Sequence, residues 1–288
     1  MIPKPPLFSV LAGSLALVSG LHAGPFVPDR DTLFLAGFDR YLDRADYAHG
    51  WDRFGGGGYT AVDGYYGKAL DLRGIVLPDD FWKVENGFYP HFSQWLFWPR
   101  GNVDFRQGTL ECWFRVAPKG TRFNHLTGVD LLHFQSFQPL APLVGEDGKP
   151  QAIQPFIRLN TDHLSWLLVT LNGEILKGRV DFSKVPGWRK KLSPDRWHHF
   201  AFQWAPEGVA FYIDGRLVGT HVLENNSGIA ITGPTQRGLG VGSVILDEFR
   251  ISARPRYGNE FEPNWREGSR PAGAFPGAPH NGEIAWKE

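Results

Sequence analysis

The sequence contains very little cysteine, and this limits how the fold can be stabilised. Cys112 is the single cysteine among 288 residues, so the chain cannot form an intramolecular disulfide. Leu110, Phe114 and Val116 alternate in step with it, and this pattern predicts a buried, unreactive thiol rather than a nucleophile. Added stability must therefore come from packing or from a bound metal ion.

An excess of either charge is also missing. The 30 Lys and Arg residues balance 30 Asp and Glu residues, and the longest basic run is Arg189-Lys190-Lys191. Proteins that bind nucleic acids or anionic membranes generally carry a larger cluster of basic residues. The sequence therefore predicts no nucleic-acid partner and no anionic-membrane partner.

Helical periodicity and the common catalytic motifs are absent as well. No stretch repeats apolar residues at helical spacing over three turns. The sequence has no Gly-x-Ser-x-Gly elbow, zincin motif, phosphate-binding loop or dinucleotide fingerprint. These absences argue against a helical fold and against the enzyme classes that depend on those motifs.

The first residues have the composition of a secretory signal peptide. Lys4 precedes an apolar run from Leu7 to Leu21, which ends in small residues at Ala23-Gly24. We expect residues 1–23 to be removed, although a retained membrane anchor is the alternative. Because no cysteine lies near the cleavage site, a lipoprotein is not expected. The predicted mature protein is secreted or periplasmic, with no membrane contact after cleavage.

The stretch from residue 196 to 222 gives the clearest secondary-structure signal. Side chains alternate along a strand, so one face carries an apolar set and the other a mixed set. The first set is His198, Phe200, Phe202 and Trp204, and the second is Trp197, His199, Ala201 and Gln203. An Asp214-Gly215 pair then separates two further apolar runs, which predicts a tight hairpin turn.

The rest of the chain reads as short strands joined by turns. There are 11 Trp and 22 Phe residues among 35 Gly and 22 Pro residues. Strands are expected at residues 32–38, 67–72, 95–98, 109–116, 131–135, 155–160, 164–170, 174–182, 236–241 and 244–252. The Gly55–Gly58 run is expected to be a flexible loop, and Pro139–Pro150 a loop with its own turn.

Short strands without covering helices predict an all-β fold. The expected architecture is a two-sheet antiparallel β-sandwich closed as a jelly roll. One domain spans residues 24–267, with an aromatic-rich insertion at about 78–100, and residues 268–288 form a Pro/Gly-rich C-terminal tail.

Five segments in a fixed order suggest a family. They are GKALDL at 67–72, GTLECWFRVAP at 108–118, WHHFAFQW at 197–204, FYIDGRLVG at 211–219, and ILDEFRIS with ARPRYGNEF at 245–261. Together they resemble the LamG-like, concanavalin A-like jelly rolls of secreted bacterial proteins. That superfamily includes lectins, carbohydrate-binding modules, glucanases, lyases and adhesive modules, so the resemblance implies a fold without selecting an activity.

Because of this resemblance, the sequence can be searched for the catalytic motifs that enzymes of the superfamily carry. The glucanases of this superfamily carry a Glu-x-Asp-x-x-Glu row, because two carboxylates on one strand face can flank a glycosidic bond. No such row occurs here, and Glu111 is the only acid of its strand. The residue sets of alginate-type lyases are missing too. We therefore expect a non-catalytic protein, with a divergent glycoside hydrolase or polysaccharide lyase as an alternative.

Aromatic residues provide the candidate carbohydrate site. Sugar faces stack on exposed rings, and the insertion supplies Trp82, Tyr89, His91, Trp95 and Trp98. The alternative is that these rings form a separate buried cluster, because large rings are more often buried than displayed.

A second candidate row is expected on one sheet face. Arg158 and Asn160 point outward there, beside Trp166. With the insertion, this row makes a polysaccharide or glycoprotein glycan the predicted partner. A structural or adhesive cell-surface protein that binds another protein is the main alternative.

Asp247 is the candidate metal ligand. Alternation places it on the same face as Ile245, Phe249 and Ile251, where an unpaired carboxylate would be costly. It could bond to backbone amides or a core arginine, or it could bind a structural Ca²⁺. Similar jelly rolls often hold calcium where the first and last strands meet, which would make Asp39 the other ligand.

Two further groups of polar residues are expected to be structural. If the strand with Glu111 and Arg115 neighbours the one with Glu248 and Arg250, the four side chains would form a charge ladder. His198 is expected to be a hydrogen-bonded core residue, since His199 points to the opposite face.

Overall fold

The computed structural model describes fourteen stretches of the chain. They are residues 24–57, 59–72, 94–115, 130–136, 140–144, 150–153, 155–160, 162–186, 188, 192–193, 196–223, 228–230, 239–242 and 244–264. The predicted signal peptide, most of the aromatic insertion and the predicted tail lie outside these residues.

The first sheet has nine strands and brings the two ends of the domain together. Its order is β16 (Arg216–Val222), β15 (Gly208–Ile213), β14 (His198–Ala205), β7 (Gly108–Arg115), β19 (Ile245–Ser252), β1 (Thr32–Ala36) and β2 (Tyr47–Ala48). A hairpin of β4 (Thr60–Asp63) and β5 (Lys68–Asp71) joins the sheet through β19. The first strand, β1, therefore pairs directly with the last, β19.

The second sheet has eight strands. Its order is β13 (Ile175–Asp181), β12 (His163–Thr170), β11 (Phe156–Asn160), β8 (Asp130–Ser136), β18 (Leu239–Gly242), β6 (Gln94–Phe97) and β3 (Gly55–Gly57), with β17 (Ile229–Ala230) on β12. A separate hairpin consists of β9 (Leu140–Val144) and β10 (Pro150–Ile153). The described helical structure is the short 3-10 turn η2 (Phe182–Lys184).

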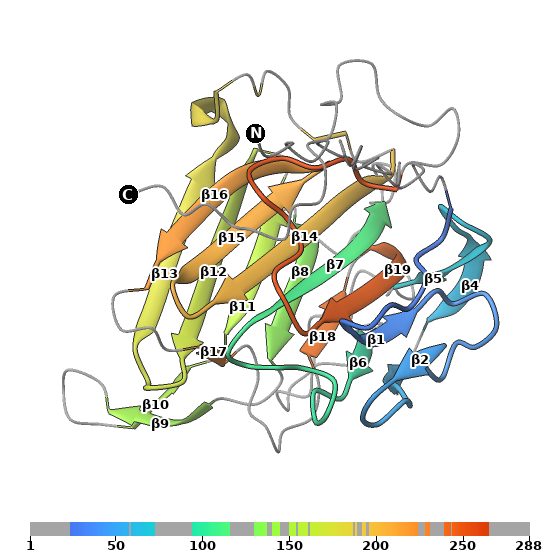
Figure 1. Cartoon of the computed structure of the whole chain (residues 1–288), viewed down its shortest axis with the longest axis horizontal. Helices are drawn as coiled ribbons and strands as arrows, with labels where there is room; N and C mark the ends of the chain where they lie inside the picture. Colours follow the sequence, from blue (N-terminus) through green and yellow to red (C-terminus); the bar gives the residue numbers. More distant parts are fainter. Residues whose placement is uncertain are drawn as a thin grey trace, which may run out of the picture.

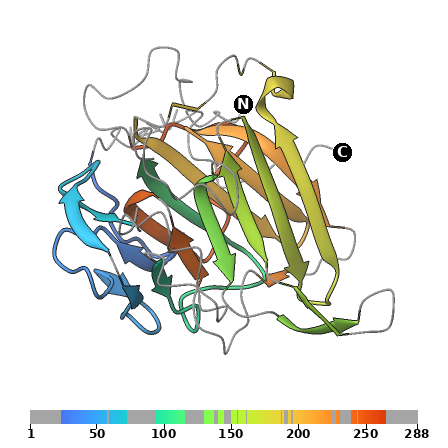
Figure 2. The same ribbon diagram turned by 180° about the vertical axis from the view of Figure 1, so that it is seen from behind.

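The two sheets pack face to face, which confirms the predicted antiparallel β-sandwich. Figure 1 shows the nine-stranded sheet in front, and Figure 2 shows the eight-stranded sheet from the other side. Each adjacent strand pair with a described register is antiparallel, as in β7 with β14 and with β19. No helix among the described residues is long and apolar enough to cross a membrane.

Alternation along the strands builds the core between the sheets. Phe200, Phe202 and Trp204 of β14 lie in this core with Cys112 of β7, and all four are fully buried. Each large apolar side chain buried in this way contributes about 1.5–3 kcal/mol. The predicted burial of the Cys112 thiol is thus confirmed.

The Asp214-Gly215 hairpin forms as predicted. Asp214 has φ of 52° and Gly215 φ of 80°, the left-handed pair that a two-residue turn with the correct twist requires. A side chain on Gly215 would lie 2.0 Å from the carbonyl oxygen of Phe261. The turn therefore also forms part of the surface against which the C-terminal segment packs.

Two sequence-based predictions about loops are wrong. Gly55–Gly57 is not a loop but strand β3, which pairs with β6, because a ladder needs only backbone groups and glycine supplies them. The region 139–150 contains strand β9, whose Leu143 pairs with Gln151 of β10. The predicted turn at Asp147-Gly148 lies outside the described residues.

The outer face of the nine-stranded sheet is covered by both ends of the described chain. After β19, the chain runs back across β7, β14 and β15 (Figure 1), and Tyr257 and Phe261 pack on Tyr212 there. Phe26 of the N-terminal segment packs near Trp113 on the same face. Both faces of the nine-stranded sheet are therefore covered here, and strands β14, β15 and β19 are buried along their whole length.

Candidate functional site

The structure describes two of the five residues of the predicted aromatic site, Trp95 and Trp98. Trp82, Tyr89 and His91 lie outside the described residues. Trp95 is fully buried, with its ring 4.7 Å from both Phe54 and Phe249. A ring in this position cannot stack on a sugar, so Trp95 is a core residue and its assignment to a displayed site is corrected.

The second predicted row is also divided. Arg158 and Asn160 are half-buried on one face of β11, but Trp166 pairs with Ile157 and points to the other face. Trp166 is 4% exposed and its ring lies 4.6 Å from that of Phe211. Because Trp166 sits opposite an inward residue, it belongs to the core and not beside Arg158.

Trp98 is the predicted aromatic residue that remains accessible, and it has a partner that the sequence did not reveal. It is half-buried after the end of β6, and its ring lies 6.0 Å from that of Trp51, with 33° between the two planes. Trp51 is 60% exposed, the largest exposed ring among the described residues. We call this pair the Trp51–Trp98 platform.

A single buried side chain holds the platform together. Asn102 is fully buried. Its Oδ1 accepts a hydrogen bond from Gly50 N at 2.8 Å, and its Nδ2 donates to the carbonyl oxygens of Trp51 at 2.8 Å and Trp98 at 3.0 Å. One amide therefore ties the backbones of both tryptophans to each other.

The two loops also touch through their backbones. A side chain on Gly50 would lie 2.0 Å from the carbonyl oxygen of Arg100, and one on Gly101 would lie 2.8 Å from the Cα of Gly50. Gly101 has φ of 80°, a conformation that favours glycine. This close approach requires glycine at both positions. It fixes the backbone of the loop that carries Trp51 relative to the backbone of the loop that carries Trp98.

The platform lies at the edge of the sandwich where the two sheets meet. Trp51 follows β2, the edge strand of the nine-stranded sheet, and Trp98 follows β6, next to the edge of the eight-stranded sheet. Neither indole N–H makes a hydrogen bond within the described part of the chain. Trp51 thus offers apolar ring surface to solvent.

The predicted calcium ligands are occupied by backbone amides. Asp39 Oδ1 accepts from Lys68 N at 2.6 Å, and Asp247 Oδ2 accepts from Tyr66 N at 2.9 Å, so both acids hold the turn between β4 and β5. Across the described stretches, no group of three or more His, Cys, Asp or Glu side chains is placed to hold a metal. The calcium site stays a prediction, and these contacts match its alternative, amide bonding.

A β-bulge changes the predicted orientation of Asp247. Asp247 pairs with Trp113 and Arg250 with Glu111, so Glu248 and Phe249 together oppose one residue of β7. Glu248 has φ of 52°. The extra residue shifts the alternation, and Asp247 faces the outer side while Phe249 enters the core. The prediction that these two side chains share a face is therefore wrong.

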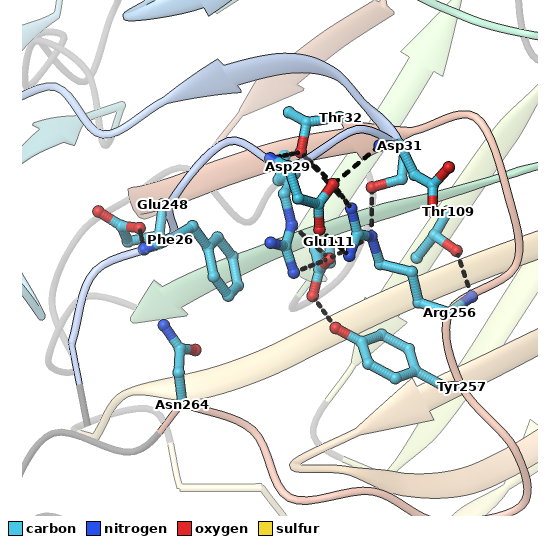
Figure 3. Close-up of polar contacts among 12 residues, drawn as sticks. Phe26, Asp29, Asp31, Thr32, Thr109, Glu111, Glu248, Arg256, Tyr257 and Asn264 are labelled. Carbon is cyan, nitrogen blue, oxygen red and sulfur yellow. Dashed lines mark hydrogen bonds and ion pairs between the residues drawn. The ribbon is translucent and has the colours of Figure 1, made fainter. Parts of the chain in front are cut away.

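A largely buried polar network links the outer face of the nine-stranded sheet to the two chain ends (Figure 3). Glu111 is fully buried, and its Oε1 accepts from Arg250 at 2.7–2.8 Å. Its Oε2 lies 3.2 Å from His199 Nε2 and accepts from the Tyr257 hydroxyl. Arg256 extends the network by a bidentate salt bridge, in which its two terminal nitrogens donate to the two carboxylate oxygens of Asp29 at 2.7 and 2.8 Å. We call these six residues the outer-face network.

The electrostatics of this network are those of a structural ion cluster. Burial disfavours the charge of Glu111, but the Arg250 guanidinium and His199 outweigh it and hold the pKa of Glu111 well below its usual value. Burial and the Glu111 carboxylate raise the pKa of Tyr257. Glu111 and Arg250 form the centre of the predicted charge ladder. The bulge removes Glu248 from that ladder, and its carboxylate accepts from Phe26 N instead.

His198 has the structural role that alternation predicts. Its Nδ1 lies 2.8 Å from Asp214 Oδ2 and its Nε2 lies 2.9 Å from the Ser193 carbonyl oxygen. The ring is 2% exposed. Burial opposes ionisation of Asp214, but His198 lowers the pKa of that carboxyl. The His198–Asp214 pair therefore stabilises the hairpin, and its buried ring is not accessible to a ligand.

No family model and no curated protein sequence matches the chain. The LamG-like resemblance of the motifs is therefore unconfirmed at the level of family.

Similar solved structures are β-rich binding domains. The binding domain of Paraclostridial Mosquitocidal Protein 1 is 17% identical, with a TM-score of 0.47, over 78% of this chain and 49% of that one. The receptor binding domain of botulinum neurotoxin D is 9% identical, with a TM-score of 0.47, over 78% and 49%. Domain 4 of AbnA, an extracellular arabinanase from Geobacillus stearothermophilus solved with arabinotriose, is 16% identical, with a TM-score of 0.39, over 78% and 93%.

The chain thus spans about half the length of the toxin domains it matches. At these identities and TM-scores the likeness is too distant to assign a ligand or an activity.

Proposed function

We propose that the protein is an exported, non-catalytic carbohydrate-binding domain, and that the Trp51–Trp98 platform is its binding site. The observation that carries the proposal is Trp51, whose ring is 60% exposed while it contacts a second tryptophan. Large rings are normally buried. Exposing apolar ring surface to water is unfavourable in free energy, and a ligand that covers this surface removes that penalty.

The rigidity of the platform supports a recognition role. The Asn102 side chain and the Gly50–Gly101 contact hold both loops in place without a ligand. A preformed site loses little conformational entropy on binding, and tryptophan offers a large contact area with few rotatable bonds. Asp52 follows Trp51 in the chain, Arg100 lies two residues after Trp98, and both are exposed; such groups can bond the hydroxyls of a sugar.

The buried acids favour binding over catalysis. Glu111, the acid of its strand that could be considered for hydrolysis, is fully buried and its oxygens are bonded to Arg250, His199 and Tyr257. A general acid or nucleophile must reach the substrate. Glu111 is enclosed by the covering chain segments instead.

A glycan array tests the proposal. We expect binding to one or more polysaccharides or glycoprotein glycans, and its loss in both Trp51→Ala and Trp98→Ala. Leu171→Ala serves as the matched control, because Leu171 is also an exposed apolar residue, 51% accessible, in the turn between β12 and β13. A blank array with a protein captured by pull-down would instead support an adhesive role. Release of sugar products from common polysaccharides would show an enzyme.

A further inference from the structure

The angle between the two platform rings limits the shape of the glycan. The planes of Trp51 and Trp98 diverge by 33° and their centroids are 6.0 Å apart. A flat surface, such as the face of a crystalline polysaccharide, can lie flush on several rings only if those rings are coplanar. With this divergence, a flat surface that lies on one ring tilts away from the other.

The fold fixes the backbones from which the two rings project. Asn102 donates to the carbonyl oxygens of both tryptophans. Gly50 packs against Arg100 and Gly101 with no room for a side chain. Neither backbone can move without breaking these buried contacts, which would leave polar groups unsatisfied, so the positions of the two Cα atoms are fixed relative to each other.

A ligand that fits both rings must itself turn. In a single polysaccharide chain that coils in solution, the faces of successive sugars are rotated relative to one another, so two neighbouring sugars can each lie on one ring. In a stiff flat ribbon packed into a crystal, the faces stay parallel, and only one ring can be used at a time.

The geometry points to a soluble, coiled polysaccharide chain as the ligand class, in preference to a flat crystalline surface. This inference rests on the proposed function, since it concerns the same platform, and it adds the shape of the ligand. Neutral glucans are the simplest probes, because coiled and flat forms of the same sugar exist and differ only in linkage.

Two binding measurements on the full mature chain test the inference. Calorimetric titration uses a soluble coiled β-1,3-glucan and amylose, and co-sedimentation uses microcrystalline cellulose. We expect binding to at least one coiled glucan. Trp51→Ala should weaken that binding about tenfold, a loss of about 1.4 kcal/mol, while Leu171→Ala leaves it unchanged. We expect no sedimentation with cellulose.

The two ways of failing differ. Co-sedimentation with cellulose that depends on Trp51 and Trp98, without binding to either coiled glucan, would overturn the inferred ligand shape while the proposed function stands. Binding to none of the probes would overturn the inferred ligand shape and leave the proposed function to the glycan array. Glucan binding that both tryptophan substitutions leave unchanged would contradict the proposed function as well. Circular dichroism of each variant verifies that it is folded.

Discussion

The outer-face network and the Trp51–Trp98 platform use polar and aromatic residues in opposite ways. In the network, Glu111 and Arg250 are buried and bonded to each other, and aromatic rings such as Tyr257 and Phe261 stack face to face at 3.5 Å. In the platform, the polar residue Asn102 is buried and the Trp51 ring is 60% exposed, while Trp98 is half-buried. The charged groups of the network are bonded to one another, whereas the exposed ring surface of the platform is available to a ligand.

The same contrast appears within one short segment. Trp95 and Trp98 are close in sequence, yet Trp95 enters the core between the sheets and Trp98 meets Trp51 outside it. Composition alone does not distinguish the two. The two residues differ in their place relative to strand β6: Trp95 lies within β6, whereas Trp98 follows the end of the strand.

The largest effect is expected from breaking the network. Glu111→Gln leaves the Arg250 guanidinium buried without a counter-charge, and breaking a buried ion pair costs about 3–5 kcal/mol. The free energy of unfolding in urea measures this. Glu174→Gln is the matched control, because Glu174 is exposed and should change stability by less than about 0.5 kcal/mol. Equal effects of the two substitutions would show that the network does not stabilise the fold.

The next effect concerns the residue beneath the platform. Asn102→Ala removes three hydrogen bonds and leaves buried backbone groups unsatisfied, which costs about 1–3 kcal/mol. We expect lower stability and weaker glycan binding together. Asn172→Ala, at an exposed asparagine in the turn between β12 and β13, is the control. If Asn102→Ala kept full affinity, Asn102 would not be a positioning residue of the platform.

Much of the fold could be predicted from sequence because it depends on local alternation. The strand from His198 to Ala205 and the Asp214-Gly215 turn are read directly from residue order. The bulge at Glu248 could not be, because a glutamate in a left-handed conformation gives no local signal. That one residue reversed the predicted orientation of Asp247 relative to Phe249.

The candidate site was only half predictable. Trp98 was found because it lies in an aromatic-rich segment, but Trp51 lies in a separate loop with no such neighbourhood. The contact between them depends on Asn102 and on the close approach of Gly50 to Gly101. Long-range backbone contacts of this kind leave no periodic pattern in the sequence.

A smaller effect is expected from pH. Burial, opposed by the Phe26 amide and aided by Asp39, raises the pKa of Glu248 to about 7. Since the folded-state pKa lies above the unfolded value, the protonated acid favours the fold. This contribution is complete below about pH 4 and is lost as pH rises through 7, with at most about 1.4 kcal/mol for each unit of pKa difference.

The lowered pKa values of Glu111 and Asp214 act in the opposite direction, because their stabilisation is lost as pH falls below about 4. Urea unfolding between pH 5 and 8 should therefore show stability falling with pH, and Glu248→Gln should flatten that slope. An unchanged slope in this variant would mean that another group titrates there.

The smallest effect concerns calcium. If Asp39 and Asp247 only accept hydrogen bonds from the amides of Lys68 and Tyr66, EDTA and added Ca²⁺ leave Tm unchanged. Thermal unfolding under both conditions measures this. A rise of Tm with Ca²⁺ that Asp247→Asn removes would establish the predicted metal site and show that these carboxylates do more than hold a turn.

The division between a structural network and a binding platform is tested most directly on Trp51→Ala, by measuring its urea unfolding and its glycan affinity side by side. Because the ring is 60% exposed, we expect the free energy of unfolding to change by less than about 0.5 kcal/mol, while the Kd for the glycan rises about tenfold. A clear loss of stability with unchanged affinity would contradict the account, because Trp51 would then serve the fold and not the ligand.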